Sequence, residues 1–310
     1  MGELRKDYIL DRYVIIASER NKRPHQFRQE KVSKHVDKCF FCPGNEHLTP
    51  EELGRIKKGD SWLIRYFPNK FPAVKKKGEM IVSTDNNFFT YSDSFGMHEV
   101  IVETPEHEKE LADLSVSHIK KILNVYSSRI KCLADKPGIK YVSVFKNHGK
   151  DAGTSIIHTH SQVIAYNIVP GIIRKKEDAC KDSCAYCRII QIEKDSHRKC
   201  FENEDAVAFT PYASRFPFEI WILPKRHRIN ITEFNDREIE SAAKILKKIL
   251  VMLQELNSPY NMYLHYGTRN LHFQIIIAPR LAKWAGFELS TGTIINPISP
   301  EKAAKFYREG

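Results

Sequence analysis

Apolar residues recur at helical spacing in two long segments of the chain. Between residues 117 and 134 they are Ile119, Ile122, Leu123, Tyr126, Ile130 and Leu133, and between 236 and 256 they are Ile239, Ala242, Leu246, Ile249, Leu250 and Leu253. Because residues three and four apart share one face of a helix, each segment predicts an amphipathic helix with a buried side. Ser115 or Ser117 can cap the first helix by accepting a hydrogen bond from its first turn.

Runs of apolar and β-branched residues lie before and after each helix and predict strands. Before the helices stand HEVIVETPEH, which ends at His107, and FEIWILPKRH, which ends at His227. After the helices, turns at Pro137-Gly138 and Ser258-Pro259 lead into KYVSVFKN and YNMYLHYG, and a further strand follows in each half. A CxxC pair, a strand, a helix and two strands therefore follow one another twice, which predicts two related repeats.

The repeated order predicts an α+β fold in which each repeat is a mostly antiparallel sheet flanked by its helix. We place the boundary between Pro170 and Cys180, where NIVPGIIRKKEDACKD interrupts the apolar pattern, so that the repeats cover residues 1–172 and 173–310. In a chain of 310 residues, two units of this size each bury an ample core.

The composition, 42% hydrophobic and 28% charged, is typical of a soluble globular protein. No run approaches the roughly 18 apolar residues of a membrane span, and MGELRKDY lacks the apolar core of a secretion signal, so we expect a cytoplasmic protein without a membrane partner. The formal charge of +11, from 49 basic and 38 acidic residues, attracts anionic partners. Because the basic residues are scattered, a nucleotide or sugar phosphate accounts for this charge as well as nucleic acid does, and we expect no nucleic-acid partner.

Seven cysteines include two CxxC pairs, one in each repeat. An odd total without a secretion signal argues against a disulfide framework and favours zinc, with a redox CxxC as the competing interpretation. Each pair supplies two of the four ligands of a tetrahedral site, and the repeat supplies two histidines at matching places. The candidate ligands are Cys39, Cys42, His107 and His158 for the first site, and Cys184, Cys187, His227 and His272, with His265 nearby, for a second.

The segment 147–162, NHGKDAGTSIIHTHSQ, carries chemistry that only the first repeat offers. A glycine-bearing loop leads into a short apolar strand, where alternation places His158, His160 and Gln162 on one face. A neutral imidazole can attack phosphorus, and a neighbouring amide can hold a non-bridging phosphate oxygen. The second repeat has His272-Phe-Gln274 at this place, and an amide nitrogen is a poor nucleophile. We therefore expect one catalytic and one structural repeat.

Several separated motifs point to a family. They are ASERNKRP, CFFCPGNE, YFPNKFPAV, HEVIVETPEH, FKNHGKDAGTSIIHTHSQ, PYASRFPFEIWILPKRH and AGFELSTGTIINPISPE, and they extend over nearly the whole chain. In these motifs the chain resembles the galactose-1-phosphate uridylyltransferase family, a branch of the histidine triad superfamily built from two fused repeats. The resemblance implies histidine-triad-like repeats, a structural zinc ion in the first cluster, and a homodimer whose site is completed across the interface. Family members differ in the second metal, so that site stays open.

The resemblance also implies a role for each matching residue. His160 is the covalent nucleophile, and Gln162 holds the transferred phosphate. The implied substrate contacts are Arg20 and Arg23 for phosphate groups, Asn69 for the nucleotide, Asn147, Gly153 and Ser155 in the loop beside the nucleophile, and Lys283 and Glu288 for the sugar. The implied reaction is ping-pong transfer of a nucleoside monophosphate from a nucleoside-diphosphate sugar to a sugar 1-phosphate, through a nucleotidyl-histidine.

Departures from the family pattern bear on the substrate. The best-known relatives read HPHGQ where this chain reads HTHSQ, Lys70 stands where some have an aspartate for the ribose, and KWAGFELSTGT is closer to broader-specificity members. We expect UDP-glucose:galactose-1-phosphate uridylyl transfer, and the alternative is a phosphorylase acting on ADP-glucose or on diadenosine tetraphosphate. A non-catalytic, zinc-dependent nucleic-acid binding protein is a third interpretation, which leaves the HxHxQ strand without a use.

Overall fold

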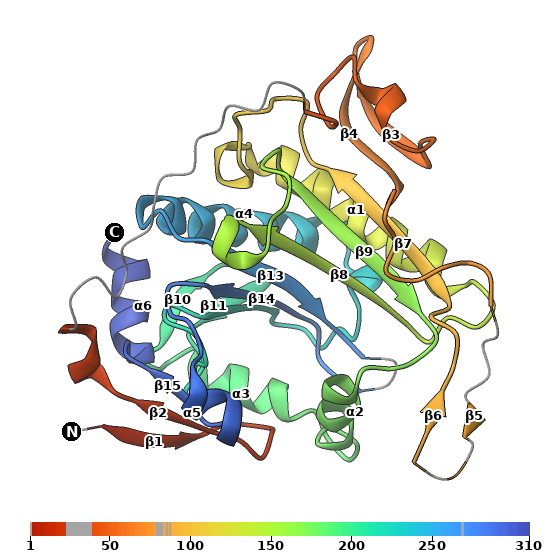
Figure 1. The fold of residues 1–310 in the computed structure, drawn as a ribbon. Helices are drawn as coiled ribbons and strands as arrows, with labels where there is room; N and C mark the ends of the chain where they lie inside the picture. Colours follow the sequence, from red (N-terminus) through yellow and green to blue (C-terminus); the bar gives the residue numbers. More distant parts are fainter. Residues whose placement is uncertain (1, 23–38, 79–82, 85, 87, 268–269) are drawn as a thin grey trace.

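The centre of the molecule is a ten-stranded sheet, seen in a computed structural model that describes residues 2–22, 39–78, 83–84, 86, 88–267 and 270–310 (Figure 1). Its strand order is β10-β11-β12-β14-β13-β8-β9-β7-β4-β3, and every neighbouring pair is antiparallel. The strands are β3 (Gly54–Lys58), β4 (Ser61–Pro68), β7 (Gly96–Val102), β8 (Tyr141–His148), β9 (His160–Tyr166), β10 (Lys199–Glu202), β11 (Ala206–Phe209), β12 (Ile220–Pro224), β13 (Tyr260–His265) and β14 (Gln274–Pro279).

The two halves of this sheet repeat one strand order. From the centre outward, the first half runs β8-β9-β7-β4-β3 and the second runs β13-β14-β12-β11-β10. The halves join where β8 pairs with β13, with Asn147 opposite Asn261 and Phe145 opposite Tyr263. The expected α+β fold of mostly antiparallel sheet flanked by helices is confirmed. The expected boundary between residues 172 and 173 falls inside α2 (Gly171–Asp178) and stays a prediction.

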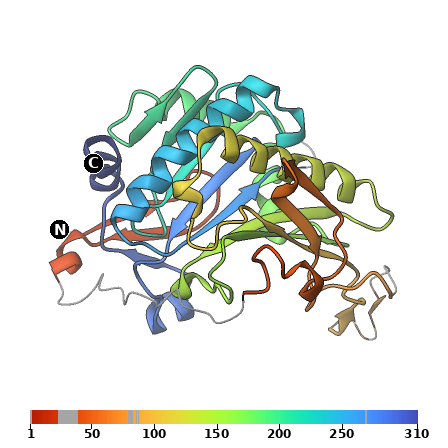
Figure 2. The same cartoon turned by 90° about the horizontal axis from the view of Figure 1, so that it is seen from above.

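Two long helices, α1 (Val116–Ala134) and α4 (Asp236–Glu255), lie side by side over one face of the sheet (Figure 1, Figure 2). Both occur where the apolar spacing predicted a helix, and all the apolar positions named for them are buried. Ser115 caps α1 by accepting a hydrogen bond from the N–H of His118. At the start of α4, Asn235 and Glu238 each accept from the other's backbone N–H, which satisfies two donors that the helix leaves unpaired.

The shorter elements complete the fold. Strands β1 and β2 form a small sheet with β15, below the large sheet in Figure 1, so the beginning and the end of the chain meet. These elements are β1 (Glu3–Lys6), β2 (Tyr13–Ile16), β15 (Ile294–Asn296), α3 (Ala185–Glu193), α5 (Gly286–Thr291), α6 (Pro300–Glu309), the hairpin β5 (Ser83–Thr84) and β6 (Thr90–Tyr91), and the short helices η1 (Ser18–Lys22), η2 (Glu46–Leu48), η3 (Leu111–Asp113), η4 (Lys150–Ala152) and η5 (Ile231–Glu233). None of the helices in the described ranges is long and apolar enough to cross a bilayer.

Candidate active site and metal centres

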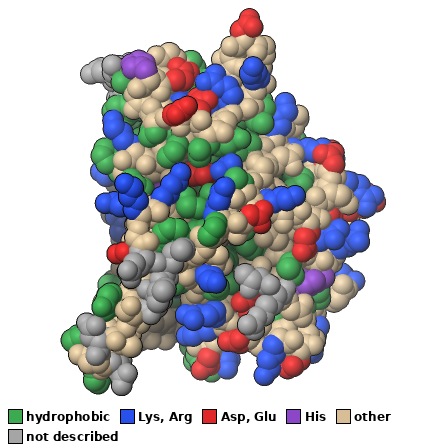
Figure 3. Space-filling view, turned by 90° about the vertical axis from the view of Figure 1, so that its right-hand side faces the viewer, with side chains coloured by type: hydrophobic (Ala, Val, Ile, Leu, Met, Phe, Trp, Pro, Cys, Tyr) green, Lys and Arg blue, Asp and Glu red, His purple; other side chains and the backbone are tan. Residues whose placement is uncertain are grey.

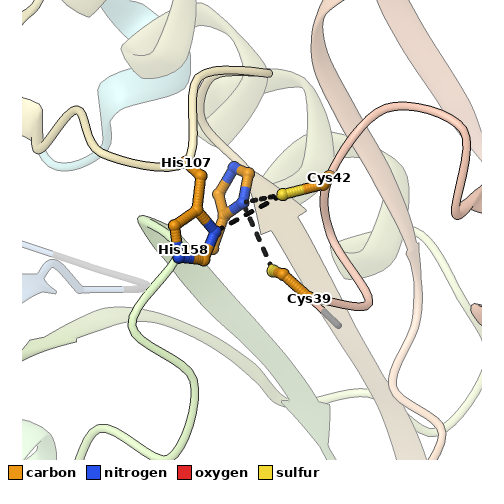
Figure 4. A group of neighbouring side chains, drawn as sticks. All are labelled: Cys39, Cys42, His107 and His158. Atoms are coloured by element: carbon orange, nitrogen blue, oxygen red, sulfur yellow. Dashed lines mark hydrogen bonds between the residues drawn. The ribbon is translucent and has the colours of Figure 1, made fainter. Parts of the chain in front are cut away.

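Four side chains from distant parts of the first repeat converge on one point (Figure 4). The Sγ atoms of Cys39 and Cys42 lie 3.5 and 3.6 Å from His158 Nδ1, and Cys42 Sγ lies 3.4 Å from His107 Nδ1. His158 donates its Nε2–H to the carbonyl oxygen of Thr104 at 2.7 Å, which turns Nδ1 toward the sulfurs. Burial lowers the pKa of His158 to about 4, so its ring is neutral, which is the form that ligates a metal ion.

The second repeat holds the same arrangement. Cys184 and Cys187 lie 3.8 and 3.5 Å from His272 Nδ1, and Cys187 lies 3.4 Å from His227 Nδ1. His272 donates its Nε2–H to the carbonyl oxygen of Pro224 at 2.8 Å, and burial lowers its pKa to about 4. This second cluster is more open than the first, because His227 is exposed whereas no member of the first cluster is.

Both clusters fit a tetrahedral zinc ion. Zinc–sulfur bonds of about 2.3 Å and zinc–nitrogen bonds of about 2.0–2.1 Å at tetrahedral angles place sulfur and nitrogen about 3.5 Å apart. The sulfur-to-nitrogen distances run from 3.4 to 3.8 Å, and the ligand atoms of each cluster lie within 4.8 Å of one another. Four protein ligands leave no position for substrate, so an ion bound at either cluster would be structural.

His160 begins β9 beside the first cluster, with one ring nitrogen engaged. Its Nδ1 lies 2.9 Å from the carbonyl oxygen of His158, which can only accept, so Nδ1 carries the proton and Nε2 holds the lone pair. Burial and, second, the charge of the Lys146 ammonium lower the pKa of His160. The ring is therefore neutral at pH 7, and the nitrogen able to attack phosphorus is Nε2.

The ring of His160 is mostly buried, but its Nε2 atom is not fully buried. The residue is 7% exposed. In the described ranges, the buried side-chain nitrogen and oxygen atoms without a partner are Arg65 Nε, Tyr186 Oη and Arg280 Nε. His160 Nε2 has no protein partner there and is not among them, so it is open to solvent. Phe41, between the two cysteines of the first cluster, packs edge-on against the ring at 5.3 Å between centroids, so the loop that carries Cys39 and Cys42 helps to fix the orientation of the ring.

The expectation that one strand presents His158, His160 and Gln162 together was wrong for the first of them. Strand β9 begins at His160, so His160 and Gln162 share a face while His158 lies in a bend before the strand. Before the strand, the His158 ring is held instead by the Thr104 carbonyl on one side and the cysteine sulfurs on the other. Gln162 is half-buried, and its Oε1 lies 2.9 Å from Nε2 of His98.

The loop before β9 carries three of the expected substrate contacts. Asn147 lies near the end of β8, the neighbour of β9, and Ser155 is exposed in the loop. Gly153 ends η4 with φ of +86°, a left-handed conformation that favours glycine. Lys283 lies 3.4 Å from Asp151 in the same loop, which brings the expected sugar segment to its edge.

The other residues expected to contact the substrate are Arg20, Arg23, Asn69 and Glu288. Arg20 is half-buried in η1, and Arg23 lies outside the described residues. Asn69 follows β4, and its Nδ2 lies 3.2 Å from Nε2 of His98. Glu288 accepts a hydrogen bond at 3.0 Å from the N–H of Ala285, the residue before its own helix α5. No contact recorded in the described ranges joins Arg20 or Glu288 to His160.

Sequence reasoning missed a buried ion pair behind β9. The Nζ atom of Lys146 donates to Glu103 at 2.6 Å, with side chains 1% and 0% exposed. Lys146 also donates to Thr159 Oγ1 at 2.7 Å and to the His160 carbonyl oxygen at 3.1 Å, while Ser161 donates to Glu103 at 2.5 Å. Burial alone raises the pKa of Glu103, but the ammonium and these donors outweigh it, so its pKa lies below the ordinary value. Both departures in HTHSQ, the hydroxyl residues Thr159 and Ser161 beside His160, therefore belong to this network.

The second repeat has a similar arrangement, with Gln274 in the place of His160. Gln274 donates its Nε2–H to the carbonyl oxygen of His272 at 3.1 Å, as His160 donates in the first repeat. The buried Nζ of Lys176 donates to Gln274 Oε1 at 3.0 Å and to His265 Nδ1 at 2.9 Å. His265 is thus bound to Lys176 and is not a member of the second metal cluster.

Comparisons with known proteins agree with this geometry. Residues 2–170 match the family described as galactose-1-phosphate uridyl transferase, N-terminal domain, and residues 112–306 match a domain of unknown function, DUF4921. An ADP-glucose phosphorylase from Arabidopsis thaliana is 34% identical over 99% of this chain and 92% of that protein. A galactose-1-phosphate uridylyltransferase from Thermotoga maritima is 30% identical over 100% of this chain and 98% of that protein.

Solved structures give the same result. The structure of an ADP-glucose phosphorylase from Arabidopsis thaliana with bound ADP-glucose matches with a TM-score of 0.85 and 32% identity, covering 100% of this chain and 99% of that one. A uridylyltransferase structure matches with a TM-score of 0.76 and 28% identity, covering 99% and 97%. The chain is a nucleotidyltransferase and belongs to the galactose-1-phosphate uridylyltransferase family.

Proposed function

We propose that this protein transfers a nucleoside monophosphate from a nucleoside-diphosphate sugar to an acceptor phosphate through a covalent nucleotidyl-His160 intermediate. The observation that carries the proposal is the state of the His160 ring. Its Nδ1–H is held by the carbonyl oxygen of His158, and its Nε2 is unprotonated and open to solvent. A ring oriented in this way offers its lone pair to phosphorus without first losing a proton.

The reaction proceeds in two displacements. His160 Nε2 attacks the phosphorus next to the nucleoside, and the bond from that phosphorus to the bridging oxygen breaks. The electron pair leaves with the sugar 1-phosphate. An oxygen of the acceptor phosphate then attacks the same phosphorus, the phosphorus–nitrogen bond breaks, and the neutral ring returns. The protein contributes orientation and hydrogen-bond donors, since charge shifts among phosphate oxygens in both steps.

Zinc bound at the first cluster would support this chemistry indirectly. The cluster holds His158, whose carbonyl oxygen fixes the His160 tautomer, and Phe41, which packs on the His160 ring. An ion there would fix the loop and the segment leading into β9. The second cluster has no nucleophile beside it, because Gln274 stands at that place. An ion there would stabilise the second repeat.

For the donor, we propose ADP-glucose with inorganic phosphate as the acceptor. The support is that the Arabidopsis ADP-glucose phosphorylase shares more identity with this chain than the Thermotoga uridylyltransferase does, 34% against 30%, and that the phosphorylase structure has the higher TM-score, 0.85 against 0.76 for the uridylyltransferase. The second candidate is UDP-glucose:galactose-1-phosphate uridylyl transfer, which the match of residues 2–170 to the uridyl transferase domain favours.

Trapping the intermediate tests the mechanism and names the base. The protein is incubated separately with ADP-glucose and UDP-glucose labelled at the phosphate next to the nucleoside, and the acid-labile label on the protein is counted. We expect label on the wild type and none on His160→Gly. The labelled protein is then chased with inorganic phosphate or galactose 1-phosphate, and the acceptor that releases the label is the substrate. Absence of label with both donors would overturn the proposal.

The surface agrees with a small anionic substrate. On the face seen in Figure 3, Lys and Arg side chains are spread among acidic, hydrophobic and other side chains and do not gather in one stripe. A scattered distribution suits long-range attraction of a nucleotide sugar better than the tracking of a nucleic-acid backbone. Binding of single- or double-stranded DNA in low salt, undiminished in His160→Gly, would favour the nucleic-acid interpretation instead.

We also propose that the protein is a homodimer. Helix α5, in the expected sugar segment, exposes Phe287 and Leu289, which are 45% and 75% exposed. Contact with a second copy would cover these side chains and place Lys283 and Glu288 at the interface. Light scattering of the wild type and of Leu289→Lys tests this, with a dimer expected for the first and a weakened dimer for the second.

A further inference from the structure

Two side-chain amides on the strands beside His160 have their oxygen atoms occupied by other parts of the protein. Gln162 lies two residues along the same strand, and Asn147, on the neighbouring strand β8, lies opposite His160 if the pairing of Phe145 with Gln162 is continued by two residues. Gln162 Oε1 lies 2.9 Å from His98 Nε2, and Asn147 Oδ1 lies 2.9 Å from Asn261 Nδ2.

A backbone N–H settles the orientation at Gln162. The N–H of Ala73, which can only donate, lies 3.1 Å from His98 Nδ1, so that nitrogen is the acceptor of the ring. The pKa of His98 is lowered by burial, so the ring is neutral and its proton is on Nε2. That proton is donated to Gln162 Oε1. Asn69 Nδ2 also lies 3.2 Å from His98 Nε2, but that nitrogen carries the proton of the neutral ring and cannot accept a hydrogen bond from Asn69.

A backbone carbonyl settles the orientation at Asn147 in the same way. The carbonyl oxygen of Ala152, which can only accept, lies 2.9 Å from one side-chain atom of Asn261, so that atom is Nδ2. The same Nδ2 donates to Asn147, whose facing atom is therefore Oδ1. Asn261 Oδ1 accepts in turn from Arg280.

The consequence is a pair of amides that present only donors to the space beside His160. The amide nitrogens of Gln162 and Asn147 have no partner in the described part of the chain and are not among its buried unpaired atoms, so both are open to solvent. Non-bridging phosphate oxygens only accept hydrogen bonds, and they match such groups. An amide turned the other way would present an oxygen and repel them.

We infer that His98 and Asn261 are positioning residues of the transfer reaction, which hold Gln162 and Asn147 with their NH₂ groups toward the transferred phosphate. The inference rests on the proposed function. Neither residue needs to touch the substrate. Asn261 belongs to the second repeat, on β13, so the repeat without a nucleophile contributes to the site by orienting an amide of the first.

The test measures the single-turnover rate of protein labelling with the donor that labels the wild type. His98→Asn can still accept from the Ala73 N–H but is too short to reach Gln162, whereas His98→Gln can make both hydrogen bonds. We expect the rate to fall about ten- to a hundredfold in His98→Asn, below the roughly 10²–10³-fold loss typical of removing a donor outright, and to stay within about threefold of wild type in His98→Gln. The apparent Kd of the donor should change much less than the rate.

A double-mutant cycle distinguishes a role through Gln162 from a general structural role. In a Gln162→Ala background, His98→Asn should cause no further loss, because the group it orients is gone. In the same way, Asn261→Asp, whose carboxylate can only accept, should turn the amide of Asn147 around and slow labelling, but not in an Asn147→Ala background. Thermal unfolding of each variant supplies the measure of stability.

The outcomes separate this inference from the proposed function. Absence of label on the wild type overturns the proposed function. Label on the wild type, with an unchanged rate in both His98→Asn and Asn261→Asp, overturns the inference alone. It is also overturned if the losses persist undiminished in the Gln162→Ala and Asn147→Ala backgrounds, since the two residues would then act on the fold and not through the amides.

Discussion

The buried pair of Glu103 and Lys146 makes a quantitative prediction about stability. The Glu103 carboxylate accepts four hydrogen bonds, from Lys146 at 2.6 Å, Thr159 at 2.8 Å, Ser161 at 2.5 Å and Tyr126 at 2.9 Å. The substitution Glu103→Gln keeps the size of the side chain and removes its charge. It leaves the ammonium of Lys146, whose side chain is 1% exposed, without a counter-ion in a site that water does not reach.

The expected cost follows from the burial of both partners. Removing one partner of a buried ion pair costs about 3–5 kcal/mol. Unfolding entropy of about 2.1 cal/mol/K per residue amounts to about 0.65 kcal/mol/K for 310 residues, so the melting temperature should fall by about 5–8 °C. Replacing both partners, as Glu103→Leu with Lys146→Met, removes the unpaired charge and should cost less than Glu103→Gln alone.

Thermal and urea unfolding, followed by circular dichroism, measure these differences. The control is Glu106→Gln, which removes the partner of Lys109 in a surface pair of similar length, 2.7 Å, with side chains 54% and 46% exposed. This change should shift the free energy of unfolding by no more than about 0.5–1 kcal/mol. A loss below about 1 kcal/mol for Glu103→Gln, or a double variant as unstable as the sum of its two singles, would refute the reasoning.

Further predictions concern pH and metal. Because burial and the Lys146 charge lower the pKa of His160, the acid limb of the single-turnover labelling rate should lie below pH about 6.5, and a limb at or above that value would contradict the assignment. Burial lowers the pKa of Lys176 from 10.5 to about 7. Between pH 7 and 10.5 the unfolded chain therefore binds one proton more than the folded chain, and the free energy of unfolding rises with pH. From pH 7 to 9 the wild type should gain about 2–3 kcal/mol relative to Lys176→Met, and a difference between the two proteins that stays constant with pH in urea unfolding would contradict this. Cys42→Ser should lose zinc, measured by mass spectrometry, together with protein labelling. Cys184→Ser should lose one equivalent and melt at a lower temperature while most labelling remains, and equal loss of labelling in both variants would show that the clusters do not differ in role.

The sequence predicted the two long helices and the two metal clusters because each has a periodic or repeated pattern of residues. The apolar spacing of α1 and α4 predicts both helices because a buried helical face needs residues three and four apart. The second cluster was predicted only because the repeat placed His227 and His272 where the first half has its own histidines, and the structure brings each set of four together. A local pattern that occurs twice in one chain therefore predicted contacts between residues more than a hundred positions apart.

The sequence did not predict the roles of Glu103, Lys146 and His98, because these roles depend on which other elements pack over the polar side chains. Glu103 and Lys146 occupy positions in HEVIVE and SVFKN where a charged residue normally faces solvent. Only the packing of α1 behind these strands, with Tyr126 reaching Glu103, makes the position buried. The sequence likewise carries no signal for His98, because its side chain contacts Gln162, which is 64 residues away, and no local pattern contains that contact.

The two repeats differ at the place where His160 stands in the first. In each repeat, the last histidine of the CxxC cluster, His158 or His272, donates its Nε2–H to a backbone carbonyl. Two residues later, the side chain of His160 or Gln274 donates to the backbone carbonyl of that same histidine. In the first repeat the donor is the ring of His160, whose other nitrogen keeps a lone pair. In the second it is the amide of Gln274, whose remaining oxygen accepts a hydrogen bond from the buried Nζ of Lys176. A metal cluster and the backbone contact are therefore shared by the proposed active site and its copy, and the lone pair on His160 Nε2, which has no partner among the described residues, is the feature that separates them.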